Sequence, residues 1–316
     1  MLEFNRAMSS AIRLGFTMYV LAFAGLLSSA ALAEEAVPAA ADATAIPPSL
    51  FSGGKLLATG GVSQLEGAGG GGLTPWALVT GNATDEGIGA NVHSTAVYAQ
   101  EFNLQSYGIA VGLFDRLELS YARQEFDTQS TGVALGLGKG YTFGQDIWGL
   151  KLRILGDAVY DQDRWVPQVA VGAQWKHADH AAILAAVGAR DDEGVDLYVS
   201  ATKLLLAESL LLNATVRFTR ANQTGLLGFG GNLENDHEPS LEGSAAWMIR
   251  RDLVAGVEYR MKPDNLGFAR EDDWADIFVA WFPSPYVSVT LAYADLGDIA
   301  TREDQRALYL SLQTGF

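Results

Sequence analysis

The chain has 316 residues, enough for one large domain or two ordinary ones, and 49% of them are hydrophobic. It contains no cysteine, which excludes disulfides, thiolate metal sites and cysteine nucleophiles. The formal net charge of −16 argues against a nucleic-acid partner, because phosphate binding needs a basic face. Beyond residue 33 the longest apolar run is AAILAAVGA at 181–189, which is too short to cross a bilayer as a helix. That part of the chain is therefore either soluble or a β-barrel whose polar interior dilutes its apolar surface.

The first 33 residues have the pattern of an export signal. Two arginines precede an uncharged apolar stretch at 14–27, and the small-residue sequence Ala-Leu-Ala then ends at Ala33. We interpret residues 1–33 as a secretory signal peptide; the alternative is an amino-terminal membrane anchor. Residues 34–52 are rich in alanine and proline and aperiodic, and we predict a flexible periplasmic leader there.

From about residue 54 onward, segments of roughly ten residues alternate between apolar and polar side chains, the period-two pattern of β-strands. In the segment 164–176, Trp165 and Trp175 share one face with the apolar residues between them, whereas Gln174 and Lys176 lie on the other face. A tryptophan at each end of an apolar face is typical of the aromatic girdles of membrane barrels.

The polar faces of these segments argue against a soluble β-sandwich. They carry ionisable residues in mid-strand, among them Lys151, Asp196 and Arg217, and a packed core does not hold so many charges. The alternation therefore predicts an all-β fold: an up-and-down antiparallel transmembrane β-barrel of about 12–14 strands.

The last segment, ALYLSLQTGF, alternates and ends on Phe316. It resembles the carboxy-terminal signal that the barrel-assembly machinery reads in bacterial outer-membrane barrels. We therefore expect export through the periplasm to the cell outer membrane. The expected partners are outer-membrane lipid, lipopolysaccharide and, through the last strand, the barrel-assembly machinery; no nucleic acid is expected.

Short and long links alternate along the chain, as hairpin turns and surface loops do in an up-and-down barrel. The longer, polar links lie at 127–146, 176–193, 220–238, 263–273 and 296–305. The predicted strands within the barrel domain 53–316 are 54–64, 73–81, 89–100, 105–114, 117–126, 147–156, 165–175, 194–204, 209–219, 239–249, 253–262, 274–282, 286–295 and 306–316. The first two are weak, because the glycine-rich stretch 53–72 is either a first strand or a luminal plug, and a plug leaves twelve strands. A short helix with Asp179 as its cap is predicted within 178–188.

The strand faces predict two sets of side chains. Candidates for the lumen mix both signs of charge: Glu118, Lys151, Arg153, Asp196, Arg217, Glu242, Glu258, Arg260, Lys262 and Asp276. Candidates for the membrane girdle are the aromatic residues Trp148, Trp165, Trp175, Phe218, Trp281 and Phe316. If the charged set lines water, the pore has no strong preference for either ion sign; if it pairs across strands, the lumen is blocked.

Motifs for chemistry are weak. His177 and His180 form an H-x-x-H pair that supplies at most half of a metal site, and we interpret them as surface histidines. Asp236 and His237 resemble the pairs of outer-membrane aspartyl-type proteases, but a solvated loop is the simpler interpretation. We predict no catalytic residue, no metal site and no cofactor, and we do not expect an enzyme.

Three functions remain open at this stage. The first is a porin-like channel or transporter for small solutes, for which a barrel of this size has room if no plug is present. The second is a structural or interaction barrel with a filled lumen. The third is an outer-membrane enzyme, which the histidine and serine patterns support least.

Three segments of the chain carry a family resemblance. They are GGKLLATGGVSQLEGAGGGGLTPWALVTG (53–81), SYGIAVGLFDRLELSYARQEFDT (106–128) and GARDDEG (188–194). They resemble an uncharacterised bacterial family, domain of unknown function 3034, over nearly the whole chain after the signal. The resemblance implies an exported outer-membrane protein; it implies no activity and no functional residue.

Overall fold

The computed structural model describes residue 50 and residues 54–316. The predicted signal peptide 1–33 and nearly all of the predicted leader 34–52 lie outside the described residues. None of the described helices has the length and apolarity needed to cross a membrane.

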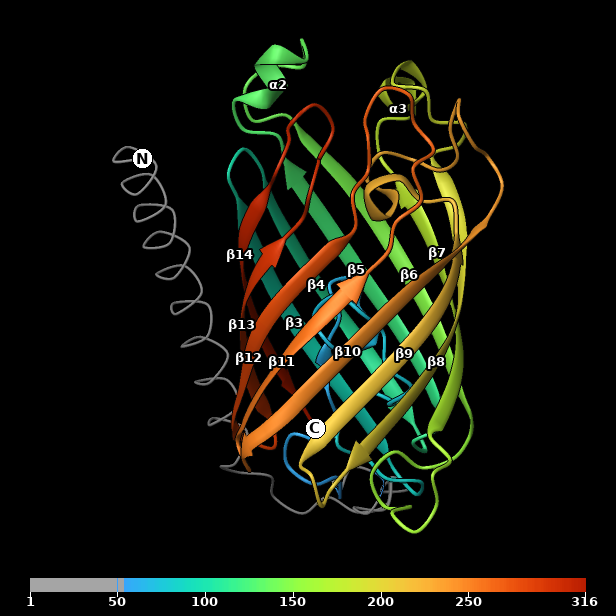
Figure 1. The fold of residues 1–316 in the computed structure, drawn as a ribbon, viewed down its shortest axis with the longest axis vertical. Helices are drawn as coiled ribbons and strands as arrows, with labels where there is room; N and C mark the ends of the chain where they lie inside the picture. Colours follow the sequence, from blue (N-terminus) through green and yellow to red (C-terminus); the bar gives the residue numbers. More distant parts are fainter. Residues whose placement is uncertain (1–49, 51–53) are drawn as a thin grey trace, which may run out of the picture. The chain divides into compact units, whose positions relative to one another are not determined.

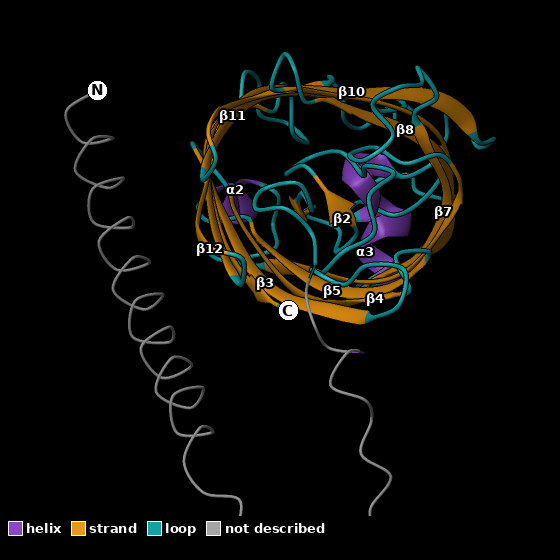
Figure 2. Ribbon diagram, turned by 90° about the horizontal axis from the view of Figure 1, so that it is seen from below, coloured by secondary structure: helices purple, strands orange, loops and turns teal. Residues whose placement is uncertain are grey.

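Twelve antiparallel strands form a closed barrel in which each strand pairs with its neighbours in sequence and β14 closes on β3 (Figures 1 and 2). This confirms the predicted fold class. The strands are β3 Ile88–Ala99, β4 Asn103–Leu113, β5 Leu117–Asp127, β6 Thr142–Leu155, β7 Gln168–Ala178, β8 Glu193–Leu205, β9 Leu210–Thr219, β10 Glu238–Arg250, β11 Leu253–Arg260, β12 Trp274–Ser284, β13 Val287–Asp295 and β14 Arg306–Gly315.

The segments 54–64 and 73–81, which the alternation pattern offered as strands, are not part of the barrel wall. Every residue from Val62 to Thr80 is buried, and this stretch, called the plug below, lies inside the lumen. Within it, β1 Val62–Ser63 and β2 Gly69–Gly70 form a separate two-stranded sheet, and Figure 2 shows β2 inside the ring of strands. The many glycines of this stretch weaken a strand but let the backbone fold closely against the wall.

The two ends of the barrel differ. At the short-turn end, short links join β4 to β5, β8 to β9, β10 to β11 and β12 to β13. At the long-loop end lie α2 Thr131–Ala134, α3 Ala181–Ala186 and η2 Asn222–Gly225, of which α2 and α3 are labelled at the top of Figure 1. Outer-membrane barrels carry short turns on the periplasmic side and long loops outside.

Two local predictions differ from the structure. The helix α3 is shorter than the predicted 178–188, and its cap residue is His180, with φ 70°, rather than Asp179. Asp179 instead forms an ion pair with Arg123, with 2.5 Å between Oδ2 and Nη2. The strand β7 begins at Gln168, so Trp165 lies in the link before the strand and is 87% exposed.

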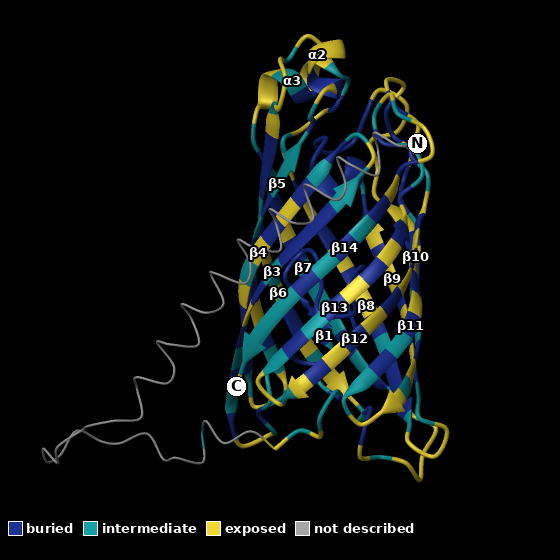
Figure 3. Cartoon of the chain, turned by 90° about the vertical axis from the view of Figure 1, so that its left-hand side faces the viewer, coloured by how far each residue is buried: buried dark blue, intermediate teal, exposed yellow. Residues whose placement is uncertain are grey.

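The outer face of the barrel is apolar. In β8, Val195, Leu197 and Val199 are exposed while Asp196 and Tyr198 are buried, and Figure 3 shows the same alternation along the neighbouring strands. A closed barrel that turns such a surface outward is an outer-membrane barrel in contact with lipid. The girdle candidates Trp148, Trp165, Trp175, Phe218, Trp281 and Phe316 are all exposed, and Trp148 stacks on Trp175 with 4.6 Å between ring centroids.

Lipid contact predicts that the cost of a charge depends on its depth. Val199 lies in the middle of β8, and Val195 lies on the same face near its long-loop end. We expect Val199→Arg to lower the free energy of unfolding by about 2–4 kcal/mol and Val195→Arg by about 0–1 kcal/mol. Denaturant unfolding in liposomes measures both values. Equal costs at the two positions would contradict a membrane centred on these strands.

Candidate functional site: the plugged lumen and the pocket above it

The plug places one carboxylate among three cations of the wall. Glu66 contacts Lys176 of β7, lies 2.8 Å from Nη1 of Arg260, and lies 3.6 Å from Nη2 of Arg217. All four side chains are buried. Burial raises the pKa of Glu66, but the charges of Arg260, Lys176 and Arg217 outweigh it and hold the pKa below its usual range.

Two wall carboxylates complete this cluster. Asp196 lies 2.6 Å from the Nζ of Lys176 and 3.3 Å from Nη1 of Arg217. Glu242 lies 2.5 Å from the Nε of Arg217 and 3.6 Å from the Nε of Arg260. The wall alone therefore presents three cations and two anions here, and Glu66 of the plug supplies the third negative charge.

A second ionic contact joins the plug to strands β5 and β6. Glu118 and Lys151, on neighbouring strands, lie 3.0 Å apart. Glu118 accepts hydrogen bonds from the backbone N–H groups of Gly69 at 2.9 Å and Thr80 at 2.8 Å, and Lys151 donates to the carbonyls of Gly69 and Leu78 at 2.7 Å each. Glu118 and Lys151 therefore bind the plug backbone as well as each other.

Glu258 anchors the bend of the plug. It accepts hydrogen bonds from the backbone N–H of Leu73 at 2.8 Å and the hydroxyl of Thr74 at 2.7 Å. The hydroxyls of Thr74 and Ser244 lie 2.6 Å apart, and the indole N–H of Trp76 donates to Ser244 at 2.9 Å. Further backbone groups are also satisfied by the wall: Ser106 donates to the carbonyl of Leu65, Thr215 to that of Pro75 and Gln168 to that of Ala77.

Seven of the ten lumen candidates belong to these three sites. Five contact the plug directly: Glu118, Lys151, Arg217, Glu258 and Arg260. Asp196 and Glu242 pair only with cations of the wall. Arg153 instead lies at the short-turn end, where it pairs with Asp115 and, at 3.1 Å, with Asp157. Asp276 is buried opposite Glu258 in the strand register, and its Oδ1 has no hydrogen-bond partner among the described residues.

Lys262 lies just beyond β11, at the long-loop end. Its Nζ is 3.3 Å from Glu271 and 4.8 Å from the centre of the Trp274 ring. Burial raises the pKa of Glu271 despite the opposing charge of Lys262.

Sequence reasoning missed Glu66 and Lys176 as site residues. Lys176 follows the alternation of its strand and shares a face with Gln174, which is a signal for the lumen. Glu66 gave no such signal, because its glycine-rich segment has no clear period.

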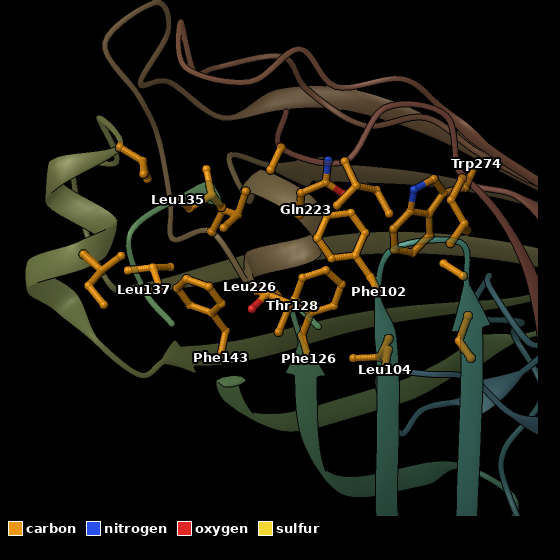
Figure 4. Close-up of a pocket in the computed structure, with 18 of the residues that line it drawn as sticks. Phe102, Leu104, Phe126, Thr128, Leu135, Leu137, Phe143, Gln223, Leu226 and Trp274 are labelled. Carbon is orange, nitrogen blue, oxygen red and sulfur yellow. The ribbon is translucent and has the colours of Figure 1, made fainter. Parts of the chain in front are cut away.

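A pocket of about 320 Å³ lies above the plug at the long-loop end (Figure 4). Its floor includes Leu65 and Leu73 of the plug, and its walls include Phe102, Phe126 and Trp274. The remaining lining comes from wall strands and from the long loops, and it is almost entirely apolar: Val97, Ala99, Leu104, Thr128, Leu135, Leu137, Phe143, Ala182, Ile183, Ala186, Val187, Gln223, Leu226, Leu227, Phe268, Ala294, Leu296, Ile299, Ala300 and Tyr309. The sequence analysis did not identify this pocket.

The histidine motifs form no centre in the part of the chain that the structure describes. Within residues 54–316 no group of three or more metal-ligating side chains is assembled. His180 packs beside the rings of Tyr141 and Phe143, and Nε2 of His237 lies 2.9 Å from the carbonyl of Val195 in an exposed position.

Solved barrels with similar structures have low sequence identity to the chain. A KdgM porin has a TM-score of 0.46 and 8% identity, covering 72% of this chain and 99% of its own. Omp33 of Acinetobacter baumannii has a TM-score of 0.40 and 10% identity, covering 72% and 97%. Outer membrane phospholipase A from Escherichia coli has a TM-score of 0.37 and 7% identity, covering 71% and 92%. No curated protein matches the chain.

A family model matches residues 59–313, which include the whole plug and the twelve barrel strands except for the last two residues of β14. The match confirms the resemblance carried by the segments around the plug and β4–β5. The chain belongs to the family described as "Protein of unknown function (DUF3034)".

Proposed function

We propose that this protein is an outer-membrane transporter for small solutes whose lumen is closed by its own plug. The observation that carries the proposal is the position of the pocket. It reaches the surface beside α3, where Ala182 and Ala186 are exposed, and its floor is formed by Leu65 and Leu73 of the plug. A solute that enters from the long-loop end thus meets the plug before it meets the rest of the lumen.

The contacts between plug and wall suit a displaceable segment. They are largely hydrogen bonds and ion pairs, and a hydrogen bond exchanged for one with water changes stability by only about 0.5–1.5 kcal/mol. The wall groups that the plug covers, such as Ser244, Thr202 and Gln168, are hydrophilic and are suited to line water once it leaves. The plug is not a strand of the barrel, so its displacement breaks no strand pairing of the wall.

An engineered disulfide tests the proposal. The chain has no cysteine, and the side-chain oxygens of Thr74 and Ser244 lie 2.6 Å apart, which is about 0.5 Å more than the S–S length of about 2.05 Å. The variant Thr74→Cys/Ser244→Cys therefore clamps the plug to β10 when oxidised. Solute entry is measured in a Gram-negative host without its own porins, with a panel of sugars, amino acids and small aromatic compounds, and conductance is measured in planar bilayers.

We expect entry of at least one class of solute with the wild-type chain, its loss in the oxidised variant and its return on reduction. The single variant Ser244→Cys controls for the substitution itself, since it forms no intramolecular disulfide. Entry that is unaffected by the clamp, or absent in every state, overturns the proposal.

A structural barrel with a permanently filled lumen is the second candidate. The observation that favours it is the extent to which wall side chains satisfy the backbone of the plug, including the carbonyls of Leu65, Pro75 and Ala77. Absence of entry in every state of the clamp is the outcome that this candidate predicts.

Both candidate functions imply the same partners and the same aromatic girdle. We propose that the exposed aromatic girdle marks the two lipid interfaces and that the long loops meet lipopolysaccharide. We also propose that β14, with Phe316 after it, is the segment that the barrel-assembly machinery reads. The lack of an enzymatic role is likewise part of the proposal, and the entry experiment addresses transport alone.

A further inference from the structure

The inner wall of the barrel changes character along its axis. Around the plug it is charged, as at Arg217 and Glu242, whereas at the long-loop end the inward positions are occupied by Val97, Leu104 and Phe126. The lumen of an outer-membrane barrel is ordinarily polar. A water-filled channel does not require an apolar ring inside its lumen. The ring therefore indicates a further role for this end of the barrel.

The long loops extend this apolar surface. Leu135 and Leu137 come from the loop between β5 and β6, Ile183 from α3 and Leu226 from the loop after η2. Figure 4 shows Leu135, Leu137 and Leu226 together with the rings of Phe102, Phe126 and Phe143 around one space. Loops from separate parts of the chain thus converge on one apolar pocket.

The pocket is of ligand size. Its volume of about 320 Å³ lies at the lower end of the range of roughly 300–1,000 Å³ for small-molecule sites. A dry apolar cavity of about 150 Å³ takes benzene in another protein, so a volume about twice as large suits a two-ring compound.

Two polar groups in the lining, the indole N–H of Trp274 and the hydroxyl of Tyr309, have no hydrogen-bond partner among the described residues. Trp274 is 4% exposed, and its indole N–H makes no hydrogen bond with any described residue. An indole N–H only donates, so a hydrogen-bond acceptor on a ligand would satisfy it. The polar side chains of Thr128 and Gln223 are already engaged with the carbonyls of Tyr141 and Asp298.

We propose that this pocket binds a small, mainly apolar ring compound that carries one hydrogen-bond acceptor, such as an aromatic ketone. Binding of the compound does not depend on transport. Only its passage past the plug rests on the proposed function. The substrate class of the transporter is then small aromatic molecules rather than sugars or ions.

The experiment measures saturable binding to the full chain in lipid nanodiscs, with empty nanodiscs to correct for partition into lipid. The probes are 2-acetylnaphthalene, naphthalene, which lacks the acceptor, and glucose. Ala186→Trp places a bulky ring in the pocket, whereas Ala185→Trp is its matched control, because Ala185 is exposed on the same helix and is not part of the lining.

We expect 2-acetylnaphthalene to bind more tightly than naphthalene and glucose not to bind. Ala186→Trp is expected to weaken binding at least about tenfold and Ala185→Trp to leave it unchanged. Trp274→Phe is expected to remove the preference for the ketone while naphthalene still binds. Equal binding in both alanine variants, or no saturable binding above empty nanodiscs, overturns the inference.

The two proposals fail separately. If the ring compound binds saturably but solute entry is the same with and without the disulfide, the transport proposal is wrong and the proposed ligand class still holds. Clamp-dependent entry of sugars, with no binding of the ring compounds, ends this inference and leaves the transporter.

Discussion

Glu66→Ala is expected to release the plug from the lumen while the barrel stays folded. The substitution leaves Lys176, Arg217 and Arg260 buried with only two carboxylates between them. Removing one partner of a buried ion pair costs about 3–5 kcal/mol, which shifts the docking equilibrium of the plug by roughly a hundredfold to a few thousandfold. Since no strand pairing involves Glu66, the cost falls on the plug rather than on the wall.

A cysteine at Ala77, a buried plug residue with a small side chain, reports on this release. In the otherwise cysteine-free chain, its labelling by a maleimide is expected to be slow with Glu66 present and much faster with Glu66→Ala. Glu208→Ala is the control, because Glu208 is exposed in the turn between β8 and β9. Equally slow labelling in all three backgrounds would mean that the ionic cluster does not hold the plug.

Gly112→Val is expected to displace the plug by steric contact alone. Gly112 lies on the luminal side of β4, and a Cβ there would press against the carbonyl oxygen of Thr80 and lie 2.9 Å from Cγ1 of Val79. Real Cβ atoms do not show contacts under 3.0 Å, so the end of the plug has to move. The strand itself accepts valine, because Gly112 does not have a positive φ and valine favours strands.

The loss of two contacts accompanies this displacement. The bonds from Thr80 to Glu118 and from Lys151 to the carbonyl of Leu78 place the same stretch of plug against the wall. In Gly112→Val we therefore expect two rates to rise together: amide hydrogen exchange at Thr80 and maleimide labelling of Ala77→Cys. Gly243→Val is the matched control, since a Cβ at this position of β10 meets only the carbonyl oxygen of Asn213, at 3.5 Å. Unchanged exchange in Gly112→Val would place the plug farther from β4 than this structure does.

The sequence alone determined the barrel wall, because the side chains of a strand alternate strictly between its two faces. In β8 this rule placed Val195, Leu197 and Val199 outward and Asp196 inward, and the structure agrees. The same rule predicted that seven charged side chains face the lumen, and five of them contact the plug: Glu118, Lys151, Arg217, Glu258 and Arg260. The fold class and the lipid-facing surface follow from this local regularity.

Only the tertiary structure decided what fills the barrel. Glu66 meets Arg260, 194 positions later in the chain, and no local pattern indicates a contact between residues so far apart. The glycine-rich plug has no period by which a strand is told from a luminal segment, so its place depended on the charges and hydrogen-bonding groups of the closed wall. The pocket exists only where long loops converge over that plug, because its apolar lining is assembled from side chains that are scattered through the sequence.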